Sequence, residues 1–211
     1  MKKFIGVYNK SVILTYFGLF FSLFGIYQLM IINPEESINR FNIAIICMIL
    51  AGICDLFDGK IARMCKRNEQ EKQFGIQIDS LVDVVSFLVF PTIFLITIAT
   101  QLSNYTLDAF IIGSIFVLCG IIRLAWFNIT TDGNTTYYTG LPVTFISIII
   151  PLFYTFLYNL LPNLIFNFLL QIIYLIIAFL FILKIKIKKP TGKWYIIFSI
   201  IAIITIIFLI I

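Results

Sequence analysis

Two neighbouring stretches of the chain decide the fold: DLFDGKIAR at residues 55–63 and GIQIDSLVD at residues 75–83. Four of the ten acidic residues lie here, inside otherwise apolar segments. Asp55 and Asp58 are three residues apart and share one face of a helix. Asp79 and Asp83 are four residues apart and do the same. If the two helices cross a membrane in opposite directions, both pairs lie near the same rim. The spacing therefore predicts a cluster of four carboxylates between two antiparallel helices.

The composition indicates a membrane protein. Of 211 residues, 61% are hydrophobic and 12% are charged, and the mean hydropathy is +1.07. A soluble domain averages about 25% charged residues, so this chain has too few polar residues to cover a soluble globule. The same figures exclude a disordered chain and an RNA-binding domain. The four cysteines show no CxxC spacing, which excludes a disulfide scaffold. There is no histidine, so metal or acid–base chemistry must use the carboxylates.

Seven stretches are candidates to cross a bilayer, because a spanning helix needs roughly 20 mainly apolar residues. They cover residues 11–32, 41–63, 75–99, 108–128, 140–160, 163–184 and 194–211. We therefore predict an all-α, polytopic membrane helix bundle. The whole chain, residues 1–211, is expected to form a single integral membrane domain.

The basic residues predict the orientation, because Lys and Arg are enriched at the cytoplasmic ends of membrane helices. Of the 15 basic residues, Arg40 alone falls on one predicted side. The other side holds Lys2, Lys3, Lys10, Lys60, Arg63, Lys66, Arg67, Lys72, Arg123, Lys184, Lys186, Lys188, Lys189 and Lys193. We expect a protein of the cell membrane with its N-terminus and its carboxylate cluster on the cytoplasmic side. The basic residues are dispersed at helix ends, so no nucleic-acid partner is expected.

Four carboxylates this close cannot all stay ionised without cations. Oxygen ligands with no His or Cys favour Mg²⁺, Mn²⁺ or Ca²⁺ over zinc, and two divalent ions would neutralise four carboxylates. Gly59 and Ala62 leave the helix surface open beside the acids, and Arg63 suits a phosphate. Two alternatives remain at this point. The acids pair with Lys and Arg of neighbouring helices, or they line the pathway of a cation-coupled transporter.

The two stretches resemble the signature of the CDP-alcohol phosphotransferase family, D-x-x-D-G-x-x-A-R, a spacer, then G-x-x-x-D-x-x-x-D. All eight signature residues are present, and the eleven-residue spacer is longer than usual. The surrounding sequence resembles the branch of the family that makes phosphatidylserine. The similar segments are residues 79–87 with Pro91, residues 119–128, where Trp126 replaces a common arginine, and residues 140–142.

The resemblance implies a six-helix catalytic core at about residues 9–190, followed by an extra C-terminal helix at about 194–211. It implies transfer of a phosphatidyl group from CDP-diacylglycerol to the hydroxyl of L-serine, with release of CMP, by a homodimer embedded in membrane lipid. By similarity, Asp55, Asp58, Asp79 and Asp83 hold two divalent cations, Mg²⁺ or Mn²⁺. Asp83 also acts as the general base. Asp55, Gly59, Ala62 and Arg63 bind the CDP group.

Which alcohol accepts the phosphatidyl group is a separate prediction. Serine carries a carboxylate that needs a cationic partner, and Arg123 is the only charged residue of the stretch 108–128 apart from Asp108 at its start. Further candidates for binding the acceptor or a phosphate are Asn128, Lys66 and Arg67. Glycerol 3-phosphate or an inositol phosphate as acceptor would bring an extra phosphate and require more basic residues. The single arginine favours a zwitterionic amino acid.

Overall fold

The computed structural model describes residues 6, 9–31, 36–103, 105–130, 137–188 and 192–210. Lys2, Lys3 and Lys189, which the predicted orientation includes, lie outside these residues. The helices are α1 (Ile13–Met30), α2 (Ser37–Met64), α3 (Glu69–Asp83), α4 (Phe90–Leu102), α5 (Thr106–Thr130), α6 (Ile146–Leu157), α7 (Asn163–Ile182) and α8 (Lys193–Ile210). Short helical turns cover Lys10–Val12 (η1) and Val143–Phe145 (η4), and a π-helical segment, η3 (Val84–Val89), joins α3 to α4.

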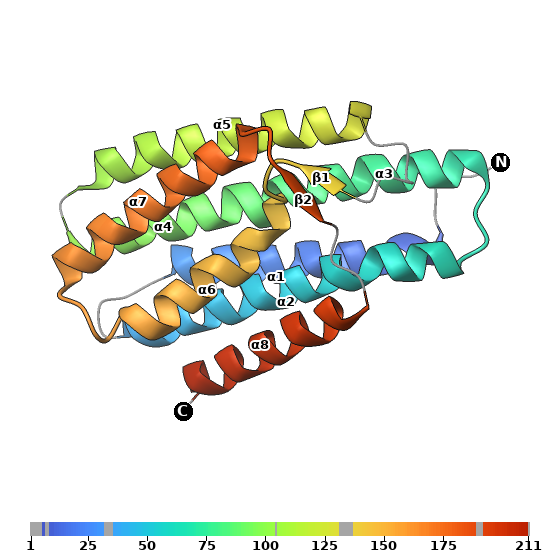
Figure 1. Cartoon of the computed structure of the whole chain (residues 1–211). Coiled ribbons are helices and arrows are strands. Elements are labelled where there is room, and N and C mark those ends of the chain that lie inside the picture. The colour runs from blue at the N-terminus through green and yellow to red at the C-terminus, as the bar shows by residue number, and fades with distance from the viewer. Residues whose placement is uncertain are drawn as a thin grey trace.

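The all-α membrane bundle is confirmed. Within the described residues, six helical segments are long and apolar enough to cross a membrane: Lys10–Met30, Ser37–Met64, Glu69–Leu102, Thr106–Thr130, Asn163–Ile182 and Lys193–Ile210. The predicted stretch 140–160 forms a shorter apolar helix, Val143–Leu157. Its start is delayed because Gly140 has a φ of +77° and Pro142 is extended. In Figure 1 the helices run side by side along one axis, and α8 lies on the outer side of α2 and α6.

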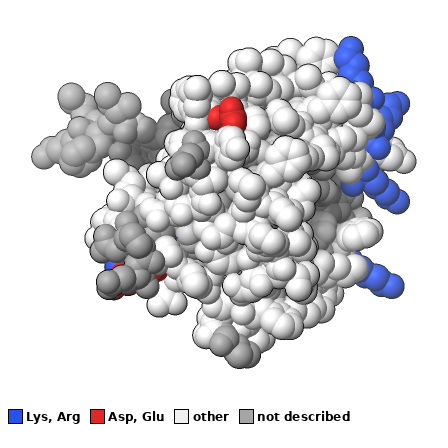
Figure 2. Space-filling view, turned by 90° about the vertical axis from the view of Figure 1, so that its left-hand side faces the viewer, with Lys and Arg blue, Asp and Glu red and all other residues white. Residues whose placement is uncertain are grey.

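The outer surface of the bundle is largely apolar. Figure 2 looks onto one end of the bundle, where most of the surface is uncharged apart from an acidic side chain near the top. Basic side chains gather along one edge of this view. Many large apolar side chains are exposed, among them Phe20, Phe110, Phe168 and Phe208, each about 60% exposed. An apolar exterior of this extent is expected where lipid, not water, is the solvent.

The helix that carries two of the four aspartates changes its hydrogen-bond pattern directly after Asp83. In η3 the spacing widens, and the Phe90 N–H bonds to the carbonyl of Val85, five residues back. Pro91 follows, and since proline has no N–H, it cannot complete the α-helical ladder there. Tyr174 of α7 donates a 2.6 Å hydrogen bond to the Pro91 carbonyl. Single π turns of this kind are frequent at functional sites.

A two-stranded ribbon, which the sequence analysis did not predict, joins two distant parts of the chain. β1 (Tyr137–Thr139) pairs antiparallel with β2 (Lys186–Lys188), and Tyr138 lies opposite Ile187. The Gly140 N–H continues the pairing with a 2.9 Å bond to the Ile185 carbonyl. A side chain at position 140 would meet the Phe181 carbonyl, and the positive φ also favours glycine. The ribbon therefore holds the segment between α5 and α6 against the end of α7.

Candidate active site

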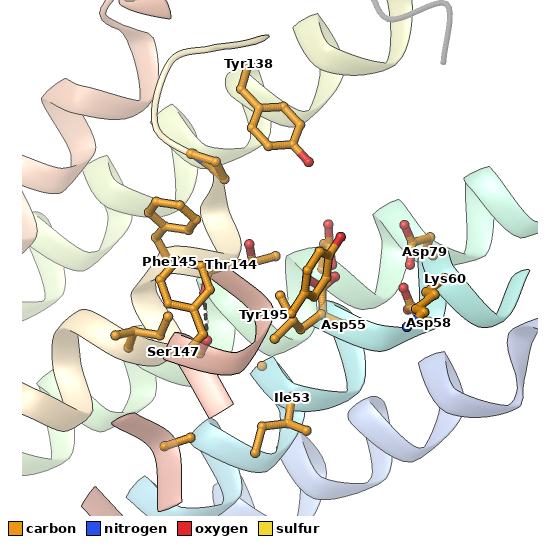
Figure 3. A pocket seen from close by; sticks show the side chains of 18 of the residues that line it. Ile53, Asp55, Asp58, Lys60, Asp79, Tyr138, Thr144, Phe145, Ser147 and Tyr195 are labelled. Carbon is orange, nitrogen blue, oxygen red and sulfur yellow. Dashed lines mark hydrogen bonds between the residues drawn. The ribbon is translucent and has the colours of Figure 1, made fainter. Parts of the chain in front are cut away.

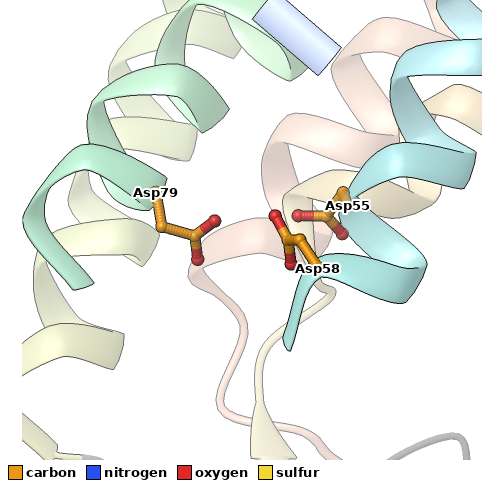
Figure 4. Close-up of side chains that lie close together, drawn as sticks. All are labelled: Asp55, Asp58 and Asp79. Carbon is orange, nitrogen blue, oxygen red and sulfur yellow. The ribbon is translucent and has the colours of Figure 1, made fainter. Parts of the chain in front are cut away.

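The centre of the site is a group of three carboxylates from two helices. Asp55 and Asp58 come from the last turns of α2 and Asp79 from α3, and one oxygen of each lies within 4.8 Å of the others. Figure 4 shows the three carboxylates pointing toward one another. Thr15 of α1 donates a 3.0 Å hydrogen bond to Oδ2 of Asp58. The two ion pairs among the described residues, Arg40–Glu36 and Lys72–Glu69, involve none of these acids. The ion-pair alternative therefore finds no support there.

Asp83, the fourth predicted acid, is one helical turn further along α3. It lines the same cavity, and its charge interacts with those of Asp55, Asp79 and Asp58. It does not belong to the group of three whose oxygens lie within 4.8 Å of one another. Asp83 adjoins the group of three through Asp55, with which its side chain interacts, although the sequence spacing treats the four acids alike.

The donor set fits a hard divalent cation. Three anionic oxygens converge at a spacing that one or two ions of the size of Mg²⁺ or Mn²⁺ can span, and no cationic side chain occupies the gap in the described part of the chain. Oxygen-only ligation is the preference of these metals. The cluster of Asp55, Asp58 and Asp79 could therefore hold such an ion.

The carboxylates face a cavity of about 250 Å³. Its walls come from α2, α3, α5, β1, the segment around η4, α6 and α8. Figure 3 shows Asp55, Asp58 and Asp79 on one side, with Tyr138 and Thr144 across the space from them. Gly59 and Arg63 also line it, and an added Cβ at Gly59 would meet nothing nearer than 3.7 Å, so the helix surface is open there. The cavity is therefore charged on the α2–α3 side and mixed on the other.

Arg123 is a buried cation in this cavity. Its residue exposure is 6%, and its Nε has no hydrogen-bond partner among the described residues. Its guanidinium lies over two aromatic rings, 5.1 Å from the centroid of Phe127 and 5.8 Å from that of Tyr138. A buried charge is costly unless it is paired, and the charges of Asp83 and Asp55 act on this guanidinium.

Several predicted residues lie elsewhere. Ala62, Lys66, Arg67 and Asn128 do not line the cavity. Asn128 exchanges hydrogen bonds with Ser80 at 2.9 and 3.2 Å, which ties α5 to α3 beside Asp79. Lys66 is exposed, and its carbonyl accepts a 3.4 Å bond from Asn9. The Nε of Arg67 is buried without a hydrogen-bond partner among the described residues, and a guanidinium nitrogen lies near Gly75, outside the cavity.

The cavity wall also holds polar residues that were not predicted from the sequence, among them Tyr138, Ser147 and Tyr195. Burial raises the pKa of Tyr138, and the carboxylate of Asp55 raises it further. The phenol is therefore neutral over the physiological range. No spacing rule links residue 138 or 195 to the aspartates. The Gly140–Pro142 turn was the nearest available signal for Tyr138.

Comparisons with known proteins show the family of the chain. The family model of CDP-alcohol phosphatidyltransferases matches residues 8–183. The chain is 36% identical over 128 residues to an archaetidylserine synthase from Methanothermobacter thermautotrophicus, which covers 61% of this chain and 52% of that protein. It is 38% identical over 116 residues to a CDP-diacylglycerol–serine O-phosphatidyltransferase from Saccharomyces cerevisiae, covering 50% and 40%. A protein with the same name from Helicobacter pylori is 34% identical over 117 residues, covering 55% and 47%. The matched part thus spans about half the length of these curated relatives.

Proposed function

The chain belongs to the CDP-alcohol phosphatidyltransferase family, and from that premise we propose that it transfers a phosphatidyl group from CDP-diacylglycerol to the hydroxyl of L-serine, giving phosphatidylserine and CMP. One observation carries the proposal. Three converging carboxylates face the same cavity as a buried arginine whose Nε has no hydrogen-bond partner among the described residues, at one end of a membrane bundle. The names of the three relatives agree on a serine lipid.

The four aspartates divide into two roles. Asp55, Asp58 and Asp79 would hold two Mg²⁺ or Mn²⁺ ions, which when bound polarise the diphosphate of the donor. Asp83 accepts the proton of the serine hydroxyl, because an alcohol is a poor nucleophile at neutral pH. The serine oxygen then forms a bond to the phosphorus that carries the lipid. The bond from that phosphorus to the CMP oxygen breaks, and CMP leaves with the electron pair.

Arg123 is assigned to the carboxylate of serine. It is buried, and its charge interacts with that of Asp83, so an amino acid held by its carboxylate at Arg123 brings its short side chain toward the base. Gly59 and Arg63 are assigned to the CDP group, since both line the cavity next to Asp58. Ala62, Lys66, Arg67 and Asn128 lie off the cavity wall, and we assign them no direct contact with the reacting groups.

The alternatives differ in what they require. Glycerol 3-phosphate or an inositol phosphate would add a phosphate to a site whose described cations are Lys60, Arg63 and Arg123. Arg63 is already assigned to the diphosphate, which leaves little charge for a second phosphorylated substrate. The cation-coupled transporter has no counterpart among the relatives, which are named as synthases and transferases.

The surroundings of the reaction follow from the same proposal. The donor is a lipid, so the site must be open to the bilayer and to water. The described basic residues fit an active site and N-terminus on the cytoplasmic side of the cell membrane. A homodimer is proposed from family membership.

A radiolabelled-serine assay tests the function. Purified protein with CDP-diacylglycerol and Mn²⁺ or Mg²⁺ is expected to form labelled lipid and an equal amount of CMP, and EDTA is expected to stop both. Lipid product with glycerol 3-phosphate but none with serine would overturn the choice of acceptor. Serine flux into sealed vesicles without CMP release would favour the transporter.

A further inference from the structure

The last helix of the chain forms part of the cavity wall, although it lies beyond the family match. The match ends at residue 183, and α8 begins at Lys193. Tyr195, Phe198 and Ala202 of α8 all line the cavity. Phe198 packs edge-on against Phe145, with ring centroids 5.9 Å apart, and Tyr195 lies 6.2 Å from the ring of Phe57 on α2. The helix is therefore docked beside the catalytic residues through its aromatic first turns.

A second tyrosine reaches the same space from the ribbon. Tyr138 is held in register by the pairing of β1 with β2, and its ring lies against the guanidinium of Arg123. The charges of Asp55 and Arg123 act on its phenol, and so does Tyr195. Figure 3 shows the hydroxyls of Tyr138 and Tyr195 both directed into the space in front of Asp55. A hydroxyl from the ribbon, next to the buried arginine that we assign to the acceptor, and a hydroxyl from α8 thus line the same cavity.

From this juxtaposition we propose that Tyr138 and Tyr195 are positioning residues that select a small zwitterionic acceptor. The inference rests on the proposed function. Arg123 binds the carboxylate of the amino acid, and the two phenols receive its ammonium group through their oxygens and ring faces. The two hydroxyls can donate hydrogen bonds to a phosphorylated acceptor, but they add no positive charge to balance its phosphate. On this view α8 completes the acceptor side of the site.

Tyr195→Phe and Tyr138→Phe test the proposal, because each removes a hydroxyl and keeps the ring. Each is expected to raise the KM for serine about tenfold to a hundredfold, the range for losing one hydrogen bond to a charged group. The kcat and the KM for CDP-diacylglycerol are expected to stay within about twofold of the parent. Damage to packing would not produce this split. Tyr195→Ala, which also removes the ring, is expected to raise the serine KM further.

The controls come from the same chain. Tyr27→Phe removes a hydroxyl from an exposed tyrosine near the other end of α1, and Ile196→Ala shortens an exposed side chain next to Tyr195. Both are expected to match the parent. The proposal is wrong if the parent uses serine and both tyrosine variants keep its serine KM, or if only the donor KM rises. A parent that releases no CMP in response to serine would instead overturn the proposed function, and the inference with it.

Discussion

The two ends of α2 are built in opposite ways. At the start of the helix, Phe41 is fully buried among aromatic rings. The nitrogen and the oxygen of the Asn42 side-chain amide both have hydrogen-bond partners. Asn42 donates to the Leu209 carbonyl at 3.0 Å and accepts from the Tyr154 hydroxyl at 3.1 Å. At the other end, Asp55 and Asp58 converge with Asp79 and face a cavity. The first end satisfies its polar groups internally, and the second leaves charge available to ligands.

This contrast separates the end of the bundle whose packing stabilises the fold from the end whose charges face the cavity. Rings of Phe41, Phe94, Tyr154, Tyr158 and Phe166 pack with centroid separations of 4.7–6.4 Å. Converging carboxylates repel one another and cost folding energy in the absence of cations. Packing of the aromatic rings therefore offsets the repulsion between the carboxylates. Substitutions at the aromatic end are expected to change stability, and substitutions at the carboxylate end are expected to change activity.

The largest effect is expected from Asp79→Asn at the carboxylate end. Losing one anionic ligand weakens the hold on the metal ions, whose contribution is worth several kcal/mol, so CMP release is expected to fall on the order of a thousandfold or more. The variant is expected to remain folded, as checked by size-exclusion chromatography in detergent. Asp108→Asn in the first turn of α5 is the matched control. Substantial activity in Asp79→Asn would remove this residue from the metal site.

At the aromatic end, Phe41→Ala is expected to lower the free energy of unfolding and to leave the KM for serine unchanged. The ring is fully buried against three others, and Phe→Ala changes in a core cost about 3–5 kcal/mol. Denaturant unfolding in micelles measures the loss. Phe20→Ala, on an exposed side chain, is expected to cost far less. An increase in serine KM in Phe41→Ala without loss of stability would break the proposed separation of the two ends.

Arg123→Gln tests whether the buried arginine at the carboxylate end binds the carboxylate of serine. It removes a buried charge that has no ion-pair partner among the described residues, so the fold is expected to tolerate it. The serine KM is expected to rise about tenfold to a hundredfold, as for loss of charge-assisted hydrogen bonds. Arg40→Gln, at the opposite end of the bundle, removes an arginine that is paired with Glu36 at 2.6 Å, and its serine KM should equal that of the parent. An unaltered KM in Arg123→Gln would exclude this arginine as the carboxylate partner.

The smallest effect is expected from Tyr154→Phe. The change removes one hydrogen bond to Asn42 and keeps the ring, so the free energy of unfolding is expected to fall by about 0.5–1.5 kcal/mol. Activity per folded molecule is expected to be unchanged. A tenfold loss of activity with normal stability would show that the aromatic end takes part in catalysis.

Much of this molecule could be predicted because its signals are local. Each apolar stretch predicts its own helix, and the spacings of Asp55 with Asp58 and of Asp79 with Asp83 predict which side chains share a face. The length of the stretch 140–160 was predicted less well, since its start depends on how Gly140 and Pro142 leave the ribbon. Asn128 and Arg67 were predicted as candidates for binding the acceptor or a phosphate, but neither lines the cavity. Asn128 exchanges hydrogen bonds with Ser80, and Arg67 lies near Gly75.

The sequence by itself determined the membrane bundle, the family and the carboxylates that form the centre of the site. These depend on composition and on short spacings within each of two helices, where helical geometry dictates which side chains share a face. Only the tertiary structure decided that Asp55, Asp58 and Asp79 form the group of mutually close carboxylates while Asp83 adjoins it at Asp55, that Tyr138 is held beside Arg123, and that α8 supplies Tyr195 to the cavity. The pairing of residue 138 with residue 187, and the docking of α8 on α2, depend on packing between segments that are distant in the chain. No local pattern records such contacts.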